Sequence, residues 1–536
     1  MKRLVIIGAF ALLFYGASSS RCIAAQESLD GGWAGGISFG GWYPIRIQFK
    51  TGSLGTEGTV YPNAYNQPVQ PLLRSSYANS QVHFEWQEED GLITFDGMLK
   101  NGVISGEIEQ NKQKGKFYLA RVANDVDLQT FSRYEGLYQL ESGKFVWIGR
   151  ASELRKQPSF IDSETGRFGT LYPSSETTFF SGATAFIPSP ADVKITFEKN
   201  SKGETTGLTW QQGSSAPKSA RRVKLYEEEE VKFQNGNVTL AGTLVKPLSK
   251  GAHPAVVFMH GSSGQTRTYF SSLPYLLASR GIASLVYDKR GSGGSTGDRR
   301  ASTFTDLADD AIAGINLLKS RKEINSKRIG VWGHSQGGWT APLAASRSKD
   351  VAFIITAAGA AVSVDRQVTD QMVINLRQEG FSEADVQAAL AHMNLYLDVR
   401  YRREPWAKLE ASTQNVRAKP WARYVWKPKS ETEVLSDLFE VHDPISVLQQ
   451  TKAPMLALFG DFDERVPPQI NAKLMEEFLK QAGNKDFTIK SFPKADHDFL
   501  EAETISDKNL LNRRRYVPDY FDTIIEWILK RVNSPK

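Results

Sequence analysis

A single serine stands between glycines where the chain leaves an apolar run. Residues 329–345 read IGVWGHSQGGWTAPLAA, in which an apolar run is followed by Gly-His-Ser-Gln-Gly and then by an alanine-rich segment. A serine at a sharp turn between a strand and a helix has a strained backbone, and its neighbours two positions away must lack side chains. Gly333 and Gly337 meet this requirement, and Gly338 allows the helix to pack closely. Ser335 is therefore the candidate nucleophile, at a helix N-terminus that favours negative charge.

A serine hydroxyl is a weak nucleophile until a base takes its proton, so a histidine is required. In a sheet of alternating strands and helices, the histidine comes after both the serine and the orienting carboxylate. His497, in FPKADHDFL just after the last strand-like run, fits this order and is the candidate general base. The other six histidines lie in a β-rich region, before or beside the serine, or in or next to a helical segment: His83, His253, His260, His334, His392 and His442.

The orienting carboxylate is expected between the serine and the histidine, at the end of a strand. The stretch MLALFGDFDERVPP offers Asp461 and Asp463, with Glu464 behind them. We choose Asp463, because a turn from Gly460 swings this second carboxylate back over the edge of the sheet. Asp461 and Glu464 are then a turn residue and a surface residue.

The tetrahedral intermediate of acyl transfer needs amide donors for its oxyanion. The backbone N–H of Gln336, directly after the nucleophile, is one candidate. The second is expected in the loop HGSSG, which follows the strand-like run AVVFM and permits close backbone approach. Ser262 is our choice for this donor, and Ser263 is the alternative.

Two other types of site find little support. The stretch DKRGSGGSTG follows a strand-like run, but it lacks the GK[ST] ending of a phosphate loop and the register of G-x-G-x-x-G. We interpret it as a structural loop beside the active site. No His-Glu-x-x-His, paired histidines or calcium-loop spacing occurs, so we expect neither a catalytic metal nor a cofactor.

The elements that position these residues follow a regular alternation. Within residues 223–536, strand-like runs such as AVVFM, IASLVY, RIGVWG and MLALFG alternate with helix-like segments. Apolar runs too uniform for a one-sided sheet, each followed by a helix, predict a mainly parallel sheet covered on both faces. This doubly wound α/β domain is interrupted at about residues 362–440 by a helical stretch with no strand.

An insertion of this length in a compact α/β domain is usually functional, and a lid over the active site is the common case. Its aromatic and basic residues are candidates for lining an acyl pocket or meeting an acidic substrate group. The alternative is that most of them pack the lid onto the core. The residues in question are Trp406, Arg417, Trp421, Arg423, Tyr424 and Trp426.

The sequence predicts only β-strands in the region before the α/β domain. Short alternating runs such as IRIQF, HFEW and KFYLA lie between turn signals. The pattern restarts near residue 133, where YEGLYQLESGKFVWIGR echoes GGWAGGISFGGWYPIRIQF. We therefore expect two similar β-units, at residues 28–125 and 130–222.

The N-terminus and the net charge indicate where the protein is located and which partners are unfavourable. Lys2 and Arg3 precede an apolar run too short to span a bilayer comfortably, and small residues follow it, so residues 1–25 are expected to be a cleaved signal peptide. Without the leader's three basic residues the net charge is +3, too small to favour nucleic acid. Cys22, the only cysteine, lies in this leader. We expect an exported protein, periplasmic or secreted, with no stable membrane anchor after processing.

Taken together, these motifs resemble the α/β-hydrolase superfamily. HGSSG, YDKRGSGGSTG, GHSQGG, FGDFDERVPP and KADHDF stand in that family's order over about residues 228–536. Within it, the chain is similar to bacterial serine esterases and to prolyl-oligopeptidase-like (S9) hydrolases. The resemblance implies attack by the serine on an ester or amide carbonyl, an acyl-enzyme, and release by water. The β-half holds fewer repeats than a propeller of the peptidase kind would need.

The sequence therefore leaves three classes of function open. The first is a carboxylic-ester hydrolase with a helical lid and a small-molecule acyl ester as substrate. The second is an S9-like peptidase or an acyl transferase with the same triad, Ser335, Asp463 and His497. The third is a binding or structural protein with a dormant hydrolase fold, which the presence of every expected catalytic group disfavours. The oligomeric state is not indicated.

Overall fold

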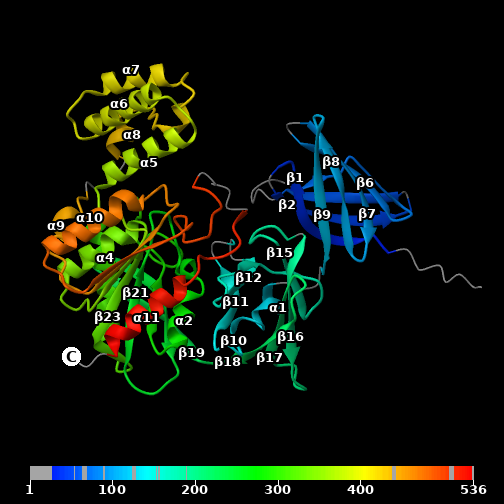
Figure 1. Cartoon of the computed structure of the whole chain (residues 1–536), viewed down its shortest axis with the longest axis horizontal. Coiled ribbons are helices and arrows are strands. Elements are labelled where there is room, and N and C mark those ends of the chain that lie inside the picture. Colours follow the sequence, from blue (N-terminus) through cyan, green and yellow to red (C-terminus); the bar gives the residue numbers. More distant parts are fainter. Residues whose placement is uncertain are drawn as a thin grey trace, which may run out of the picture.

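Three sheets organise the chain in the computed structural model shown in Figure 1. The structure describes residues 27–533, except for 41, 54, 63–68, 89–90, 124–127, 152–153, 155–156, 189, 437–441 and 506–511. The expected signal peptide lies outside the described residues. Two nine-stranded antiparallel sheets come first, and an eight-stranded, mainly parallel sheet follows.

The third sheet is the α/β domain expected from the alternation of strands and helices. Its strand order is β19-β20-β22-β21-β23-β24-β25-β26. The first two strands pair antiparallel, β20 pairs antiparallel with β22, and all later pairs are parallel. The prediction of a mainly parallel sheet is confirmed. The strands are β19 (Tyr226–Asn235), β20 (Val238–Pro247), β21 (His253–Met259), β22 (Ala283–Tyr287), β23 (Ile324–His334), β24 (Ile354–Ala357), β25 (Met455–Gly460) and β26 (Phe487–Phe492).

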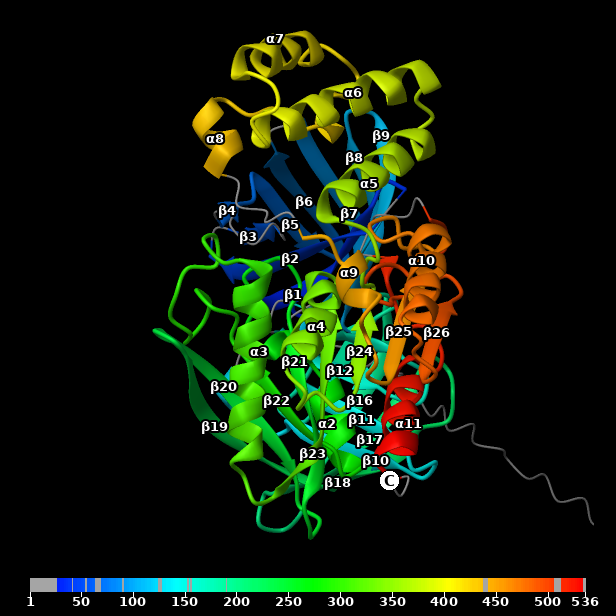
Figure 2. The same ribbon diagram turned by 90° about the vertical axis from the view of Figure 1, so that its left-hand side faces the viewer.

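Helices cover both faces of this sheet, as fully buried strands require. On one face α2 and α11 share an apolar core with the strands, and on the other face α3, α4, α9 and α10 do so. Figure 2 shows α3, α4 and α10 in front of the strands. The helices are η1 (Arg267–Phe270), α2 (Leu273–Ser279), α3 (Phe304–Lys319), α4 (Gln336–Arg347), α9 (Ile445–Leu448), α10 (Pro468–Gln481) and α11 (Tyr520–Val532).

The predicted insertion is helical and forms a separate layer above α4 (Figures 1 and 2). Its segments pack mainly on one another through two small apolar clusters of their own. They are α5 (Val364–Gln378), α6 (Glu383–Arg400), α7 (Trp406–Val416), η2 (Ala422–Tyr424) and α8 (Glu431–Ser436).

The two β-units before the α/β domain have the same topology. The first sheet has the order β4-β3-β2-β1-β9-β8-β7-β6-β5, and the second has β13-β12-β11-β10-β18-β17-β16-β15-β14. Each strand of the second sheet thus corresponds to the strand nine places earlier. The echo in the sequence falls on the matching hairpins β1–β2 and β10–β11. The prediction of two similar β-units is confirmed.

The first unit closes into a barrel with its own aromatic core. Its edges are joined by hydrogen bonds from the N–H of Leu72 to the carbonyl of Gly58 and from the N–H of Leu73 to the carbonyl of Glu85. Phe84 stacks on Phe95 inside it. The strands are β1 (Gly31–Ser38), β2 (Trp42–Gly52), β3 (Gly55–Pro62), β4 (Gln70–Pro71), β5 (Arg74–Ala78), β6 (Gln81–Glu88), β7 (Gly91–Lys100), β8 (Val103–Gln110) and β9 (Gln113–Val122).

The second unit lies against the α/β domain and shares a core with it. Leu137, Trp147 and Phe168 belong to the same buried cluster as α2 and α11. The elements are α1 (Leu128–Ser132), β10 (Gly136–Leu140), β11 (Phe145–Ala151), β12 (Gln157–Asp162), β13 (Phe168–Thr170), β14 (Tyr172–Pro173), β15 (Thr178–Gly182), β16 (Ala191–Lys199), β17 (Thr205–Gln212) and β18 (Lys218–Val223).

One buried arginine anchors this contact. Arg167 is 4% exposed, and its guanidinium donates to the carbonyls of Phe168, Gly182 and Arg514. The segment that contains Arg514 bonds in turn to the loop after His497: the N–H of Glu501 donates to Arg515 and the N–H of Val517 donates to Phe499. The second β-unit therefore supports the loop that carries the candidate general base.

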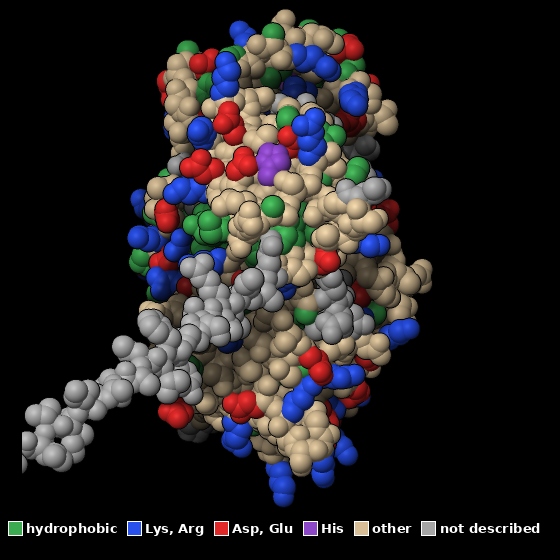
Figure 3. Space-filling view, turned by 90° about the vertical axis from the view of Figure 1, so that its right-hand side faces the viewer, with side chains coloured by type: hydrophobic (Ala, Val, Ile, Leu, Met, Phe, Trp, Pro, Cys, Tyr) green, Lys and Arg blue, Asp and Glu red, His purple; other side chains and the backbone are tan. Residues whose placement is uncertain are grey.

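The surface is electrically mixed. In Figure 3, basic and acidic side chains are interspersed over the visible face rather than gathered by sign. Within the described ranges, none of the helices combines the length and the apolar character that crossing a bilayer requires.

Replacing Arg167 with Met should loosen the contact between the second β-unit and the loop after His497. Three carbonyls would lose charged donors, so we expect the free energy of unfolding to fall by about 3 kcal/mol. Hydrogen exchange in residues 512–517 should become faster. Calorimetry and hydrogen exchange measure the two effects. Arg133→Met is the matched control, because the Arg133 side chain is 64% exposed and should change stability by less than about 0.5 kcal/mol. Equal stability of the two variants would contradict the anchoring role.

Candidate functional site

Ser335 lies at the turn between β23 and α4 with a strained backbone. Its φ is 53° and its ψ is −112°, a conformation that side-chain-bearing residues rarely adopt. The turn is held by two hydrogen bonds, from the N–H of Ser335 to the carbonyl of Ala357 (2.9 Å) and from the N–H of Gly338 to the carbonyl of Ser335 (2.8 Å).

The glycines around Ser335 leave space that no side chain could share. A Cβ on Gly333 would lie 2.0 Å from the carbonyl oxygen of Gly337, and one on Gly337 would lie 2.7 Å from that of Met259. A Cβ on Gly338 would lie 2.3 Å from the Cα of Gly359. The glycine requirement inferred from the sequence therefore has a steric cause at each of the three positions.

The structure brings His497 and Asp463 together. The Nδ1 atom of His497 lies 2.9 Å from Oδ2 of Asp463, and both residues are buried. The other carboxylate oxygen accepts hydrogen bonds from the backbone N–H groups of Arg465 (2.8 Å) and Val466 (2.9 Å). Asp461 is only partly buried, and no interaction is found between it and His497 among the described residues.

The charges of this pair are mutually stabilised. Burial raises the pKa of Asp463, but the charge and hydrogen bond of His497 and the two backbone donors outweigh it, so the pKa lies below its usual value. Burial lowers the pKa of His497, but Asp463 outweighs it and the pKa lies above its usual value. Asp498 also raises the pKa of His497, and Arg465 lowers it. His497 can therefore accept a proton while Asp463 stays ionised.

His334, one residue before the nucleophile, holds the backbone of His497. Its Nε2 lies 3.0 Å from the carbonyl oxygen of His497, and its Nδ1 lies 2.8 Å from the hydroxyl of Tyr269. Because a carbonyl oxygen can only accept, Nε2 carries the proton. Burial and the nearby charge of His497 lower the pKa of His334, so the ring is neutral and Nδ1 accepts from Tyr269.

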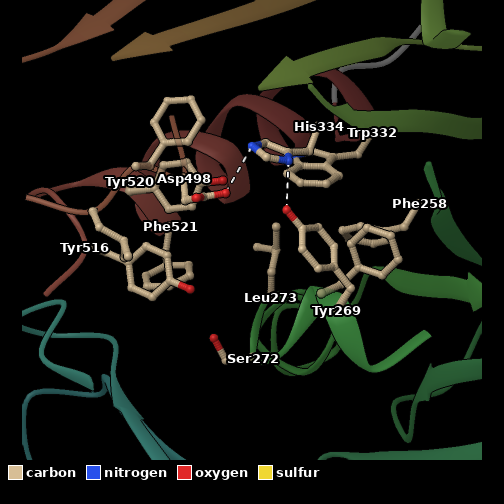
Figure 4. A pocket seen from close by; sticks show the side chains of 13 residues that line it. Phe258, Tyr269, Ser272, Leu273, Trp332, His334, Asp498, Tyr516, Tyr520 and Phe521 are labelled. Atoms are coloured by element: carbon tan, nitrogen blue, oxygen red, sulfur yellow. Dashed lines mark hydrogen bonds and ion pairs between the residues drawn. The ribbon is translucent and has the colours of Figure 1, made fainter. Parts of the chain in front are cut away.

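His334 and Tyr269 line a small aromatic cavity near the turn between β23 and α4. Figure 4 shows the rings of Tyr269, Trp332, Tyr516 and Tyr520 around it, with dashed lines from His334 to Tyr269 and to Asp498. The sequence does not favour His334 as the base, and its side chain faces this cavity rather than the one that Ser335 lines. Its support of the His497 loop was not indicated by the sequence.

A second cavity, of about 330 Å³, joins the predicted catalytic groups. Ser335, His497, Gln336 and Ser262 all line it. Ser263 does not, so the structure places the preferred oxyanion residue at the cavity and the alternative away from it.

Three parts of the chain form the walls of this cavity. Phe304 of α3 and Trp339 of α4 form the first, and Arg465 and Val466 of the loop after Asp463 form the second. Helix α5 contributes a further wall, with Val364, Gln367, Val368 and Gln371. The contribution of α5 was missed from the sequence, although Val364 and Val368 are spaced one helical turn apart.

The aromatic and basic residues proposed for the acyl pocket mostly pack the insertion itself. Trp421 is 1% exposed and donates to Asp385, and Trp426 packs edge-on against Tyr396. Arg423 bonds to Glu379 and to the Tyr424 hydroxyl. Trp406 packs on another small cluster of the insertion, and Arg417 is exposed. None of these residues lines the cavity at Ser335. The alternative, in which most of them have a packing role, therefore fits better than a role in an acyl pocket.

No group of three or more histidine, cysteine or acidic side chains that could hold a metal ion occurs within the described part of the chain. The residues that line the cavity at Ser335 include one histidine and no acidic side chain. The chemistry available there is that of a hydroxyl, an imidazole and a buried carboxylate.

Comparison with known proteins matches the α/β part of the chain to a family of serine enzymes. Residues 250–504 match the family model described as serine aminopeptidase, S33. The esterase EstD of Thermotoga maritima is 26% identical over 341 residues, which cover 61% of this chain and 74% of the esterase. Over residues 250–504 the fold is that of an α/β hydrolase. The match to a serine-enzyme family and to an esterase agrees with the expected class of enzyme.

Other relatives match shorter segments of this chain or only its general outline. The quorum-quenching protein AidA of Acinetobacter baumannii is 28% identical over 128 residues, which are 24% of this chain and 42% of that protein. Among solved structures, a Pyrococcus furiosus esterase superposes with a TM-score of 0.37 at 18% identity, covering 58% of this chain and 92% of that one. A proline iminopeptidase of Mycobacterium smegmatis has a TM-score of 0.38 at 17% identity, covering 56% and 98%.

The pH dependence of catalysis should report the His497–Asp463 pair. Only neutral His497 can take a proton, so kcat/KM should rise with pH through the pKa of His497. Asp463→Asn removes the charge that raises this pKa, so the midpoint should move to lower pH while kcat/KM falls by about 10⁴-fold. Initial rates with an acyl ester over a range of pH measure both effects. Asp461→Asn is the control and should leave the midpoint unchanged; the reverse ranking would show that the wrong aspartate was chosen.

Proposed function

We propose that this protein is a serine hydrolase that cleaves carboxylic esters through Ser335, His497 and Asp463. One observation carries the proposal: His497 is hydrogen-bonded to a buried carboxylate and lines the same cavity as a serine with strained backbone. This arrangement supplies the nucleophile, base and orienting acid that acyl transfer needs. The esterase relative supports the same chemistry.

Each group has a defined part in the proposed reaction. His497 takes the proton of Ser335 as Oγ attacks the ester carbonyl, and it then gives that proton to the departing alkoxide. Asp463 stays ionised and stabilises the imidazolium. The backbone N–H groups of Ser262 and Gln336 are assigned to the oxyanion. Water then attacks the acyl-enzyme with His497 again as base, and the carboxylic acid is released.

The charge of the cavity favours esters over aminopeptidase substrates. An enzyme that removes an N-terminal residue must hold the substrate's ammonium, and an acidic side chain is the natural partner. Among the described residues that line the cavity, none is acidic, and Arg465 is a fixed cation. The described lining of this cavity therefore offers no carboxylate partner for an ammonium, and it suits an uncharged acyl ester or one that carries an acidic group. Transfer of the acyl group to an alcohol acceptor would use the same residues.

We further propose that residues 362–440 act as a lid that sets acyl specificity. Helix α5 lies over the nucleophile and supplies Val364 and Val368 as an apolar wall, with Gln367 and Gln371 beside it. The leader-like N-terminus supports export of the protein to the periplasm or the exterior, with residues 1–25 as a cleaved signal peptide.

Ser335→Ala should abolish ester turnover, because the covalent route depends on this one oxygen. A fluorophosphonate should label the wild-type protein once, at Ser335, as read by peptide mass spectrometry. The alanine variant should remain unlabelled while its melting temperature changes little. Near-normal hydrolysis by the variant, or labelling at another serine, would refute the proposed nucleophile.

Val368→Trp should fill part of the cavity and shift preference toward short acyl chains. We expect the ratio of kcat/KM for long against short p-nitrophenyl esters to fall about tenfold, corresponding to about 1.4 kcal/mol of differential transition-state binding. Arg366→Trp is the control on the same helix, because Arg366 is exposed and lies outside the cavity. If both variants keep the wild-type ratio, α5 does not set acyl specificity.

A further inference from the structure

Lys289 is a buried cation beside the proposed active site, in the stretch DKRGSGGSTG, which the sequence predicts to be a structural loop. It is 3% exposed and is the second residue after the end of β22. Its two chain neighbours have ion-pair partners: Asp288 pairs with Arg267, and Arg290 pairs with Asp310. Lys289 makes no ion pair within the described residues, so its ammonium is bonded in another way.

The Nζ atom of Lys289 joins the two loops that carry the proposed oxyanion donors. It donates to the carbonyl oxygen of Gly261 at 2.6 Å and to Oε1 of Gln336 at 2.6 Å. Gly261 follows β21, and Gln336 begins the helix after β23. Since β22, β21 and β23 are neighbours in the sheet, one side chain links the carboxyl ends of three adjacent strands.

The bond to Gly261 determines where the next N–H points. In a trans peptide the C=O of one residue and the N–H of the next point to opposite sides of the same plane. Because Lys289 holds the carbonyl of Gly261, the N–H of Ser262 is directed away from the ammonium. A hydrogen bond from an ammonium also polarises the peptide and makes that N–H a stronger donor.

The rest of the loop restricts the peptides on either side of this one. The N–H of Gly261 donates to Oε1 of Gln265 at 2.7 Å, and the N–H of Lys289 donates to the carbonyl of Gln265 at 3.1 Å. The side chain of Arg299 donates to the carbonyl of Ser262 at 3.4 Å. Both peptides that flank the Gly261–Ser262 peptide are therefore hydrogen-bonded, and the Gly261 carbonyl itself is held by the ammonium of Lys289.

Stability alone does not account for a lysine at this position. Burying an ammonium without a carboxylate partner is costly, and an apolar side chain of similar length is often tolerated as well or better. We propose that Lys289 is a positioning residue that aligns and polarises the N–H of Ser262, and that holds the side chain of Gln336, the residue whose N–H is the second oxyanion donor. The inference rests on the proposed function and deepens it.

The electrostatics of the site agree with this role. Burial lowers the pKa of Lys289 to about 7, with a further lowering by Arg299 and an opposing effect of Asp310. The charge of Lys289 in turn adds to burial in lowering the pKa of the buried His260 beside it. An oxyanion that develops at the Ser262 donor would favour the charged form of Lys289. The charge of Lys289 therefore stabilises the transition state more than the ground state.

Lys289→Met tests the proposal, because it keeps the length of the side chain and removes the donors. We expect kcat to fall about 10- to 100-fold, less than the loss of a whole oxyanion donor, while KM stays within about twofold. The affinity for a boronic acid transition-state analogue should fall by the same factor as kcat/KM. The affinity for the carboxylic acid product, a ground-state ligand, should stay unchanged. The melting temperature should not fall.

Two further variants separate positioning from general effects. Lys289→Gln retains an N–H donor without the charge and should recover part of the lost kcat. Lys452→Met removes a lysine bond to a main-chain carbonyl, that of Ala482, in another part of the same domain and should leave the kinetics unchanged.

The outcomes distinguish this inference from the proposed function. If the wild-type protein hydrolyses no ester and Ser335 resists the fluorophosphonate, the proposed function fails. If the wild type is active but Lys289→Met keeps its kcat, or loses analogue and product affinity equally, Lys289 has no positioning role. A fall in melting temperature that matches the loss of activity would make Lys289 a structural residue instead.

Discussion

The strained backbone of Ser335 is the constraint around which the α/β domain is arranged. A side-chain-bearing residue with positive φ costs free energy on the order of 1–3 kcal/mol, and it persists only where the surroundings leave no alternative. Here the surroundings are three glycines packed against the Gly337 and Met259 carbonyls and Gly359, together with the hydrogen bond to Ala357 from the neighbouring strand. The close approach of α4 to β23 and β24 is thus a condition for exposing the hydroxyl.

The candidate catalytic residues could be predicted from the sequence because their requirements are local. Gly333 and Gly337 are needed within two residues of Ser335, and His497 and Asp463 follow recognisable strand ends. The roles of Lys289 and His334 could not be read in the same way. Each acts through a contact with a loop that is distant in the chain, Gly261 for one and His497 for the other. Nothing in a local pattern encodes the direction of such a side chain.

In the insertion, too, the sequence predicts the helices but not which side chains face the cavity. Its helices were predictable from composition, yet its most conspicuous residues, Trp421 and Trp426, satisfy the insertion's own packing. A lone helical segment must bury apolar surface somewhere, and aromatic residues are the most effective means. The cavity wall is left to the less conspicuous Val364 and Val368 on α5. Residue type alone cannot separate a side chain that packs a lid from one that faces a substrate.

The shared core between the second β-unit and helices α2 and α11 has a consequence for how such a chain can change over time. In a modular protein, domains can be exchanged or lost because each keeps its own sealed surface. Here Phe168 of the second β-unit packs on Tyr516, and Trp147 packs on Tyr275. A catalytic half released from its partner would present the apolar surface of this contact to water. The second β-unit and the α/β domain are therefore expected to be inherited together, with the first β-unit, which has its own core, as the part most free to diverge.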